Sequence, residues 1–294
     1  MLRAATRGSE LALAQVRHVA SLLEEEVEEV VVETTGDRDQ QVPIWEIGGR
    51  GVFVKEVQSA VLDGRADIAV HSAKDLPAGA VPGLVLAAVP ERDDARDALV
   101  GRPLEDLPAG ALVATGAVRR RAQLVSLRPD LTFASLRGNV DTRLRKASQY
   151  SAAVLAAAAL RRLGRIEQAA EIFDPRLMVP QVAQGALAVE CREDDDGLRE
   201  KLAAIEHQPS RRAVDAERAY LAELGGGCDL PVGAHAQIVD GTVRMTAILA
   251  SLDGRIVLRS TGEGDDPEEL GRSLAKEILD ESGGTWLLEG ASRA

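Results

Sequence analysis

One cysteine is preceded by a run of glycines. Residues 224–231 read LGGGCDLP, so three glycines lead into Cys228 and Pro231 follows closely. Glycine loses more backbone freedom on ordering than any other residue, and the run therefore predicts a loop. A thiol on such a loop is a candidate nucleophile or covalent attachment point. An incidental loop thiol is the alternative, and spacing alone does not decide between the two.

Positive charge gathers in one window of an acidic chain. The formal net charge is −12, yet residues 115–146 contain eight Arg and Lys and only two Asp, a local balance of +6. The basic residues are Arg119, Arg120, Arg121, Arg128, Arg137, Arg143, Arg145 and Lys146. Guanidinium groups bind carboxylates and phosphates through paired hydrogen bonds, so the window indicates a polyanion site. Solvated helix faces are the alternative, and the lack of a Walker-type motif disfavours nucleoside triphosphates.

The N-terminal part alternates strands and helices. Ser9 is predicted to cap a helix that runs to about Leu23, followed by a strand and turn at 27–37 and a glycine loop and helix at 48–64. Residues 66–77, ADIAVHSAKDLP, read as an apolar strand and a polar loop carrying Ser72, Lys74 and Asp75. This order predicts βαβ units, in which ligands bind beyond the carboxyl ends of the strands.

A second α/β pattern follows the polar residues 89–98, which are predicted to cross between domains. Strands are expected at 110–116 and 131–136, and helices at 117–127 and 141–148. The Ala-rich stretch 152–164 fits a strand or a helix equally. Arg119 and Arg120 open a helix directly after a strand, where free N–H groups and the helix dipole favour anions.

The C-terminal part is predicted to be a small α+β domain. Alternating strands are joined by turns at Asp240-Gly241 and Asp253-Gly254, and a helix is expected from about Pro267 to Asp280. Cys228 falls on the loop before the first of these strands.

Composition excludes several functions. An acidic chain with a pI of about 5.0 does not suit general nucleic-acid binding. No apolar run approaches the roughly 20 residues of a membrane helix, and no signal peptide is evident, so a cytoplasmic location is expected. Cys191 lies in an apolar run and is expected to be buried, and the scattered histidines predict no metal site.

The motifs together resemble one family, the porphobilinogen deaminases or hydroxymethylbilane synthases. The matching stretches occur in the family's order and span almost the whole chain. They are ATRGSELALAQ, TTGD, GGRGVFVKE, ADIAVHSAKDLP, VRRRAQL, RPDL, LRGNVDTRL, LRRLG, QGALAVECR, AERAYL and GGCDLP.

The resemblance implies a task for the loop thiol. Cys228 would carry a dipyrromethane cofactor through a thioether, and four porphobilinogen molecules would be added one at a time with loss of ammonia. Hydrolysis would then release the linear tetrapyrrole hydroxymethylbilane. Each pyrrole carries an acetate and a propionate, which explains the need for arginines.

The resemblance also implies roles for individual residues. The cofactor would be bound by Cys228, Ser72, Lys74, Thr115, Arg119, Arg120 and Arg143. The substrate's acid groups would be bound by Arg7, Ser9, Lys55, Arg137 and Arg162, with Arg50 as a further candidate. Asp75 matches the catalytic carboxylate, which stabilises positive charge on the azafulvene left by ammonia loss and helps to move protons. A mere turn residue before Pro77 is the alternative reading of Asp75.

The sequence departs from the family's pattern at a few positions. Gly116 and Ala117 stand where the family usually has serines, so two possible hydroxyl ligands are missing. Arg50 replaces a lysine, and Glu10 replaces a proline beside Arg7 and Ser9. Ala159 and Ser151 also differ from the common glycine and aspartate. These changes affect the expected affinity more than the expected chemistry.

The resemblance implies an α/β fold of two lobes like those of periplasmic binding proteins, plus the small α+β domain. The expected boundaries are 1–90 with 186–206 for the first lobe, 91–185 for the second and 207–294 for the C-terminal domain. A monomer is expected that binds porphobilinogen, has no nucleic-acid or membrane partner, and passes its product to a downstream cyclising enzyme. A solute receptor without chemistry and an inactive family member are the two rival functions.

Overall fold

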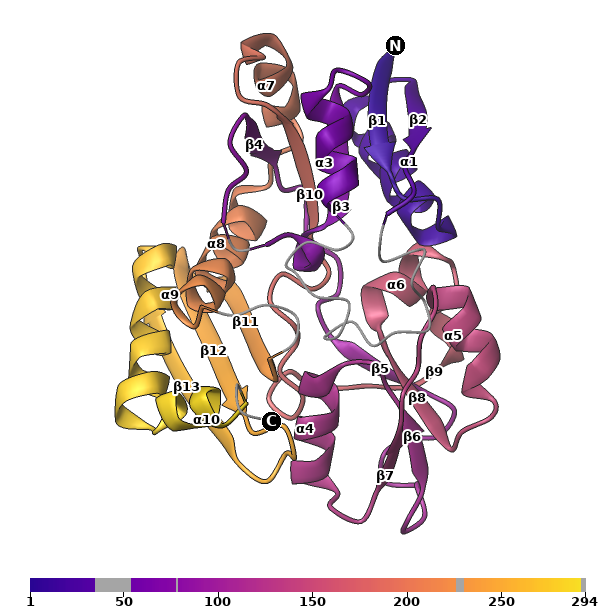
Figure 1. The fold of residues 1–294 in the computed structure, drawn as a ribbon, viewed down its shortest axis with the longest axis vertical. Coiled ribbons are helices and arrows are strands. Elements are labelled where there is room, and N and C mark those ends of the chain that lie inside the picture. Colours follow the sequence, from indigo (N-terminus) through magenta and orange to yellow (C-terminus); the bar gives the residue numbers. More distant parts are fainter. Residues whose placement is uncertain (35–53, 78, 226–229, 292–294) are drawn as a thin grey trace. The chain divides into compact units, whose positions relative to one another are not determined.

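The computed structural model describes residues 1–34, 54–77, 79–225 and 230–291 (Figure 1). Contacts divide the chain into two compact units. The first unit comprises Met1–Asp93 and Gly185–Arg211, and the second unit comprises Asp94–Gln184 and Arg212–Ala294. Each unit is thus assembled from two separate stretches of sequence.

The first unit is built on a five-stranded mixed sheet (Figure 1). In sheet order its strands are β2 (Val27–Val31), β1 (Leu2–Thr6), β3 (Ile68–Ser72), β10 (Leu187–Arg192) and β4 (Leu84–Ala88). β1 runs parallel to β2 and β3, whereas β10 runs antiparallel to β3 and β4. The helices of this unit include α1 (Glu10–Leu23), α3 (Lys55–Leu62) and α7 (Asp196–Ala203).

Strands β1 and β3 of this sheet are buried on both faces. Ala4 and Ile68 pack in one core with Val16 of α1, whereas the next residues, Ala5 and Ala69, pack in a second core with α3. Successive strand residues point to opposite faces, so a sheet covered by helices on both sides needs apolar residues at consecutive positions. This explains why β3 reads as an apolar run.

Helix α1 forms as predicted. Ser9 Oγ accepts a hydrogen bond from Ala12 N at 3.3 Å, which satisfies one of the open N–H groups at the helix start. The helix ends at Leu23, as expected. Helix α3 is also confirmed, and Val54, Val57 and Val61 are buried. The glycine loop expected before α3 lies outside the described residues.

The second unit contains another five-stranded mixed sheet. In sheet order its strands are β7 (Thr132–Ala134), β6 (Leu112–Ala114), β8 (Ala152–Ala156), β5 (Asp97–Val100) and β9 (Ala169–Ile172). β6 is parallel to β7 and β8, and β5 is antiparallel to β8 and β9. The associated helices are α4 (Val118–Leu127), α5 (Val140–Ala147) and α6 (Ala157–Arg162).

The Ala-rich stretch contains a strand and a helix in succession. Strand β8 ends at Ala156 and helix α6 begins at Ala157, with no loop residue between them. All ten residues 151–160 except Ser151 are buried. Alanine has high helix propensity, but burial can override propensity, so composition alone does not mark where the strand ends and the helix begins.

The second unit also includes the predicted C-terminal sheet. Strands β11 (Val232–Val239), β12 (Thr242–Ala250) and β13 (Val257–Gly264) form an antiparallel meander. Asp240 and Gly241 have φ values of 51° and 84°, as the predicted two-residue turn requires. Helix α9 (Pro267–Lys276) starts at the predicted proline and continues through a π-helical segment, Glu277–Glu281.

Two helices of this region were not predicted. Helix α8 (Gln208–Glu223) precedes Cys228 in the sequence, and α10 (Gly284–Ala291) follows the π-helical segment. Within the described ranges, no helix combines the length and apolar character that crossing a bilayer requires.

Candidate active site

The predicted residues of the first unit gather at one edge of its sheet. β1 and β3 are parallel neighbours, with Ala4 opposite Ile68, so their carboxyl ends lie at the same edge. Arg7 follows β1 directly, and Ser72 is the last residue of β3. Lys74 and Asp75 follow in a 3-10 turn, Ala73–Asp75. Arg7, Ser9, Ser72, Lys74 and Asp75 are all half-buried.

The turn that carries Asp75 is held at both ends. Ser72 Oγ accepts a hydrogen bond from Gln15 Nε2 of α1 at 2.8 Å. Ala73 N donates to Ala186 O at 3.0 Å, and the following Leu76 is buried. The backbone that carries Asp75 is therefore held in place, and Asp75 itself is half-buried.

A buried polar cluster lies on β3 below this turn. His71 Nε2 is 3.0 Å from Glu190 Oε2 of β10, and the two side chains are only 4% and 8% exposed. Gln58 Nε2 of α3 donates to both Glu190 oxygens, at 3.1 and 2.9 Å. Three elements thus converge where the strand approaches the turn. Sequence reasoning missed Glu190 and Gln58, because residues 132 positions apart leave no local signal.

The predicted residues of the second unit also lie at strand ends. β6, β7 and β8 are parallel to one another, so their carboxyl ends share an edge. Thr115 follows β6, and its Oγ1 accepts a hydrogen bond from Ala117 N at 3.2 Å, which turns the chain into α4. After β7, half-buried Arg137 has its pKa lowered by burial, and Arg143 Nε of α5 donates to Gly138 O at 2.7 Å.

Arg162 lies in the last turn of α6, one helix length away from this edge, and is half-buried. Lys55 is exposed at the start of α3 in the first unit. Cys228 and Arg50 lie outside the described residues.

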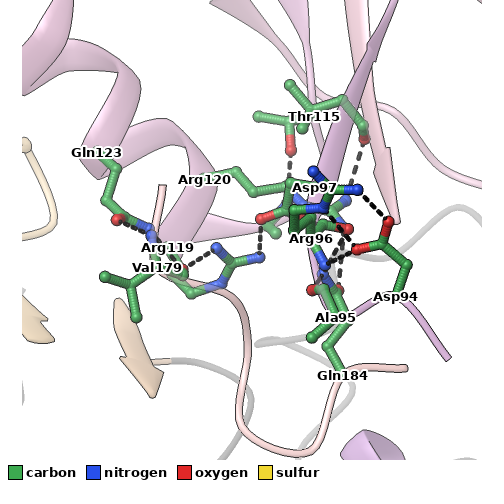
Figure 2. Close-up of polar contacts among 12 residues, drawn as sticks. Asp94, Ala95, Arg96, Asp97, Thr115, Arg119, Arg120, Gln123, Val179 and Gln184 are labelled. Atoms are coloured by element: carbon green, nitrogen blue, oxygen red, sulfur yellow. Dashed lines mark hydrogen bonds and ion pairs between the residues drawn. The ribbon is translucent and has the colours of Figure 1, made fainter. Parts of the chain in front are cut away.

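Arg119 and Arg120 converge on one buried carboxylate (Figure 2). Arg119 Nη2 is 2.7 Å from Asp97 Oδ2, and Arg120 Nη2 is 2.8 Å from Asp97 Oδ1. The exposed fractions are 4% and 6% for the arginine side chains and 0% for Asp97. Sequence reasoning missed Asp97, which it placed in a polar crossing.

Other acceptors complete this cluster. Arg119 Nη1 donates to Val179 O at 2.6 Å, and Arg120 Nη1 donates to Val154 O at 3.0 Å. Gln184 Nε2 donates to Asp97 Oδ1 at 2.8 Å, and its Oε1 accepts from Arg120 Nη2 at 3.3 Å (Figure 2).

The electrostatics of the cluster follow from burial and pairing. Burial alone would raise the pKa of Asp97, but the charges of Arg119 and Arg120 outweigh it and lower the pKa to about 2. Burial lowers the pKa of Arg119, against the attraction of Asp97. Two guanidinium charges against one carboxylate leave a net +1. Arg119 Nη2 and Asp97 Oδ2 form a buried ion pair.

The backbone at Gly116 lies very close to the backbone at Leu136. A Cβ at this position would be 2.7 Å from Leu136 O. The backbone contact therefore leaves no room for a side chain at Gly116, where the family usually has a serine.

Two features are unsuited to the predicted chemistry. Cys191 is fully buried in β10, as expected, and burial raises the pKa of its thiol. A surface hollow of about 640 Å³ is lined by Asp215, Asp265, Asp266, Pro267 and Glu268. Its four carboxylates would repel an anionic ligand. No three His, Cys, Asp or Glu side chains gather as metal ligands would, within the described part of the chain.

The fold and these sheet edges define an α/β protein with hydroxyl, ammonium and guanidinium groups after the carboxyl ends of its parallel strands. Comparison with known proteins gives the family. The family model described as porphobilinogen deaminase, dipyromethane cofactor binding domain, matches residues 2–200, and the model of the C-terminal domain of porphobilinogen deaminase matches residues 212–280.

Curated relatives agree with the family models. The chain is 46% identical to the porphobilinogen deaminase of Geobacillus kaustophilus, over 97% of this chain and 95% of that one. It is 48% identical to the porphobilinogen deaminase of Acidothermus cellulolyticus, over 95% of this chain and 88% of that one. The chain belongs to the porphobilinogen deaminase family.

Solved structures show more distant likeness. A Salmonella typhimurium periplasmic binding protein with high arginine specificity is 12% identical, with a TM-score of 0.36 over 69% of this chain and 91% of that one. An amino acid ABC transporter substrate-binding protein from Streptococcus pneumoniae is 14% identical, with a TM-score of 0.38 over 76% and 92%. Likeness at this level says nothing of ligand or activity. The chain has two five-stranded mixed sheets with their helices and a small three-stranded antiparallel sheet followed by helices, which confirms the predicted α/β class and the C-terminal α+β part.

Proposed function

We propose that this chain is a working porphobilinogen deaminase. It condenses four porphobilinogen molecules, with loss of ammonia, and releases hydroxymethylbilane for tetrapyrrole biosynthesis. The observation that carries the proposal is the family match, which covers residues 2–200 and 212–280. The basic sheet edges support it, because porphobilinogen and its products carry two carboxylates on every pyrrole.

The donor set fits a dipyrromethane. When bound, this group supplies the acceptor to which the first substrate pyrrole is joined. Cys228 would attach it, and Ser72, Lys74, Thr115, Arg119, Arg120 and Arg143 would hold its acid side chains. Hydroxyl, ammonium and guanidinium groups are the partners that carboxylates require.

The remaining predicted residues would bind the substrate. Arg7, Ser9, Lys55, Arg137 and Arg162 would hold the acetate and propionate groups of incoming pyrroles. Each charged hydrogen bond contributes about 1.5–3 kcal/mol, so even a few define a tight orientation. Orientation of the substrate is itself a large part of catalysis.

Asp75 would perform the charge stabilisation. Loss of ammonia from porphobilinogen leaves positive charge on the ring nitrogen, and a fixed carboxylate lowers the energy of that charge. The fixed Ala73–Asp75 turn supports this role, because a group that stabilises charge must be held in position. The same carboxylate can accept or return a proton during condensation.

The proposal also covers the domain boundaries, the oligomeric state, the location and the fate of the product. The three-domain division at 1–90 with 186–206, 91–185 and 207–294 is proposed as drawn from the sequence. So are a monomeric state, a cytoplasmic location and transfer of the product to a cyclising enzyme.

Intact-protein mass spectrometry tests the proposal most directly. The purified chain should carry the added mass of one dipyrromethane and should release ammonia from porphobilinogen. Cys228→Ser should have the bare sequence mass and no turnover, whereas Cys191→Ser serves as the matched control and should keep the added mass. A bare wild-type mass without turnover would indicate a receptor or an inactive family member. Added mass on the Cys228 variant would overturn the attachment site.

A further inference from the structure

Two adjacent arginines contact the same carboxylate. Their positions in the helix do not explain why their side chains converge. Arg119 and Arg120 lie in the first turn of α4. Neighbouring residues on a helix point in different directions, about 100° apart, so their side chains do not naturally converge. Here both guanidinium groups lie within 2.8 Å of Asp97. A partner outside the helix must therefore draw them together.

Asp97 is itself firmly placed. It begins β5, pairs with Ala156 of β8, and its backbone carbonyl accepts a hydrogen bond from Phe173 N at 2.9 Å. Gln184 Nε2 holds its Oδ1 and also donates to Ala95 O at 2.7 Å. The backbone of Asp97 is thus held by the two strands that flank β5, and its carboxylate is held by one amide side chain.

Each guanidinium group is held at two ends. One end faces Asp97 and the other donates to a main-chain carbonyl, Val179 O for Arg119 and Val154 O for Arg120. Two contacts of this kind fix the plane of a guanidinium group, and the plane determines which ligand oxygens it can bind in pairs.

We propose that Asp97, supported by Gln184, is a positioning residue that aligns Arg119 and Arg120 for binding the carboxylates of the dipyrromethane. The proposal rests on the proposed function. A buried ion pair is a poor way to gain stability, because well-packed apolar side chains usually serve as well. A network of this kind is better explained by the geometry that it imposes on two ligand-binding arginines.

The cluster also sets the charge offered to the ligand. Asp97 neutralises one of the two guanidinium charges, so the pair can remain buried without a ligand. Removing Asp97 would leave two like charges side by side and free both groups to separate. Misplacement of a binding group by about 1 Å can reduce a rate by about 10²-fold.

The test compares cofactor assembly in four variants. Asp97→Asn keeps the shape and removes the charge, Asp97→Glu restores the charge, and Gln184→Met removes the supporting amide. Arg96→Met is the matched control, since Arg96 pairs with nearby Asp94 at 2.7 Å and is bonded to neither arginine (Figure 2). Protein produced without the cofactor is incubated with porphobilinogen well below its melting temperature. The covalently modified fraction is followed by intact mass.

The expected order of assembly rates separates positioning from folding. Folded Asp97→Asn should assemble the cofactor about 10²-fold more slowly, Gln184→Met should be intermediate, and Asp97→Glu should recover part of the rate. Arg96→Met should match the wild type. If Asp97→Asn does not fold, the assembly rate of Gln184→Met tests the positioning role in its place.

The positioning role would be overturned if a folded Asp97→Asn variant assembled the cofactor at the wild-type rate. If Asp97→Asn is unfolded, the same rate in Gln184→Met would overturn it. Absence of assembly in the wild type would instead overturn the proposed function, and the two failures are thus distinguishable.

Discussion

Asp75 stands on a half-exposed turn of the first unit, whereas Arg119 and Arg120 of the second unit are buried around a counter-charge. The turn is held by backbone and hydroxyl contacts, at Ser72 and Ala73, which do not involve the Asp75 carboxylate. The arginines are held through their own charged atoms. Function and stability should therefore separate in the first region and be linked in the second.

The largest effect is expected when the buried cluster loses one cation. Arg120→Met would remove the partner of Asp97, Gln184 and Val154 O. Breaking a buried ion pair typically lowers the free energy of unfolding by about 3–5 kcal/mol. Arg121→Met is the matched control, because Arg121 is the next residue of α4 and is exposed. Its unfolding free energy should change by less than about 0.5 kcal/mol. Denaturant unfolding of both variants checks the difference, and equal losses would remove the contrast between buried and exposed arginines.

The next effect concerns activity without stability. Asp75→Asn keeps the shape and removes the charge, so kcat should fall by about 10²–10³. Asp75→Glu keeps the charge, moved by one methylene, and should be much faster than Asp75→Asn. The free energy of unfolding should stay within about 0.5 kcal/mol in both, since the turn does not depend on this carboxylate.

Single-turnover ammonia release and thermal unfolding would be measured together for the two Asp75 variants. An Asn variant as fast as the wild type would mean that Asp75 only shapes the turn before Pro77. The loss should appear in kcat as well as kcat/KM, because the positive charge develops only on the way to the transition state.

The same contrast explains what the sequence could and could not reveal. Caps, strand ends and the arginine-rich window are local, so α1, α3, α4 and the basic sheet edge of the second unit could be predicted. Asp97 sits in the polar stretch 89–98 and looks solvated in sequence, yet it is fully buried. Its partners lie 22 to 87 positions away, and only the folded sheet brings them together. The pairing of Asp97 with Arg119 and Arg120 could therefore not be predicted from the sequence.

A pH experiment can sharpen the comparison. Asp97 has its pKa lowered from 3.8 to about 2, because the two arginine charges outweigh the effect of burial. A carboxyl with a lower pKa in the folded state stabilises the fold above its unfolded pKa, and this stabilisation is lost as pH falls toward about 2. The difference corresponds to about 2 kcal/mol.

Asp174 offers a matched control for this effect. Hydrogen bonds from Arg176 lower the pKa of Asp174 to about 2 as well, but this pair is exposed, so solvent screening should weaken its contribution. Unfolding free energies of the wild type, Asp97→Asn and Asp174→Asn would be compared between pH 5 and pH 3. The acid-induced loss should be clearly smaller in Asp97→Asn than in the wild type, and nearly unchanged in Asp174→Asn. Equal pH dependence in all three would show that Asp97 is not the acid-sensitive group.

The smallest effect is expected at the buried cluster of His71, Glu190 and Gln58, next to the Ala73–Asp75 turn. Glu190→Gln keeps the shape and allows one hydrogen bond with Gln58, but it removes the charge facing His71 Nε2. The unfolding free energy should fall by about 1 kcal/mol, the typical value of one buried hydrogen bond. kcat should stay within about twofold of the wild type, since the Ala73–Asp75 turn keeps its contacts with Gln15 and Ala186. Denaturant midpoints and steady-state ammonia release give both quantities from one preparation. A loss of kcat as large as that of Asp75→Asn, at unchanged stability, would mean that the Glu190 charge acts on the chemistry, and the separation of function from stability in the first unit would fail.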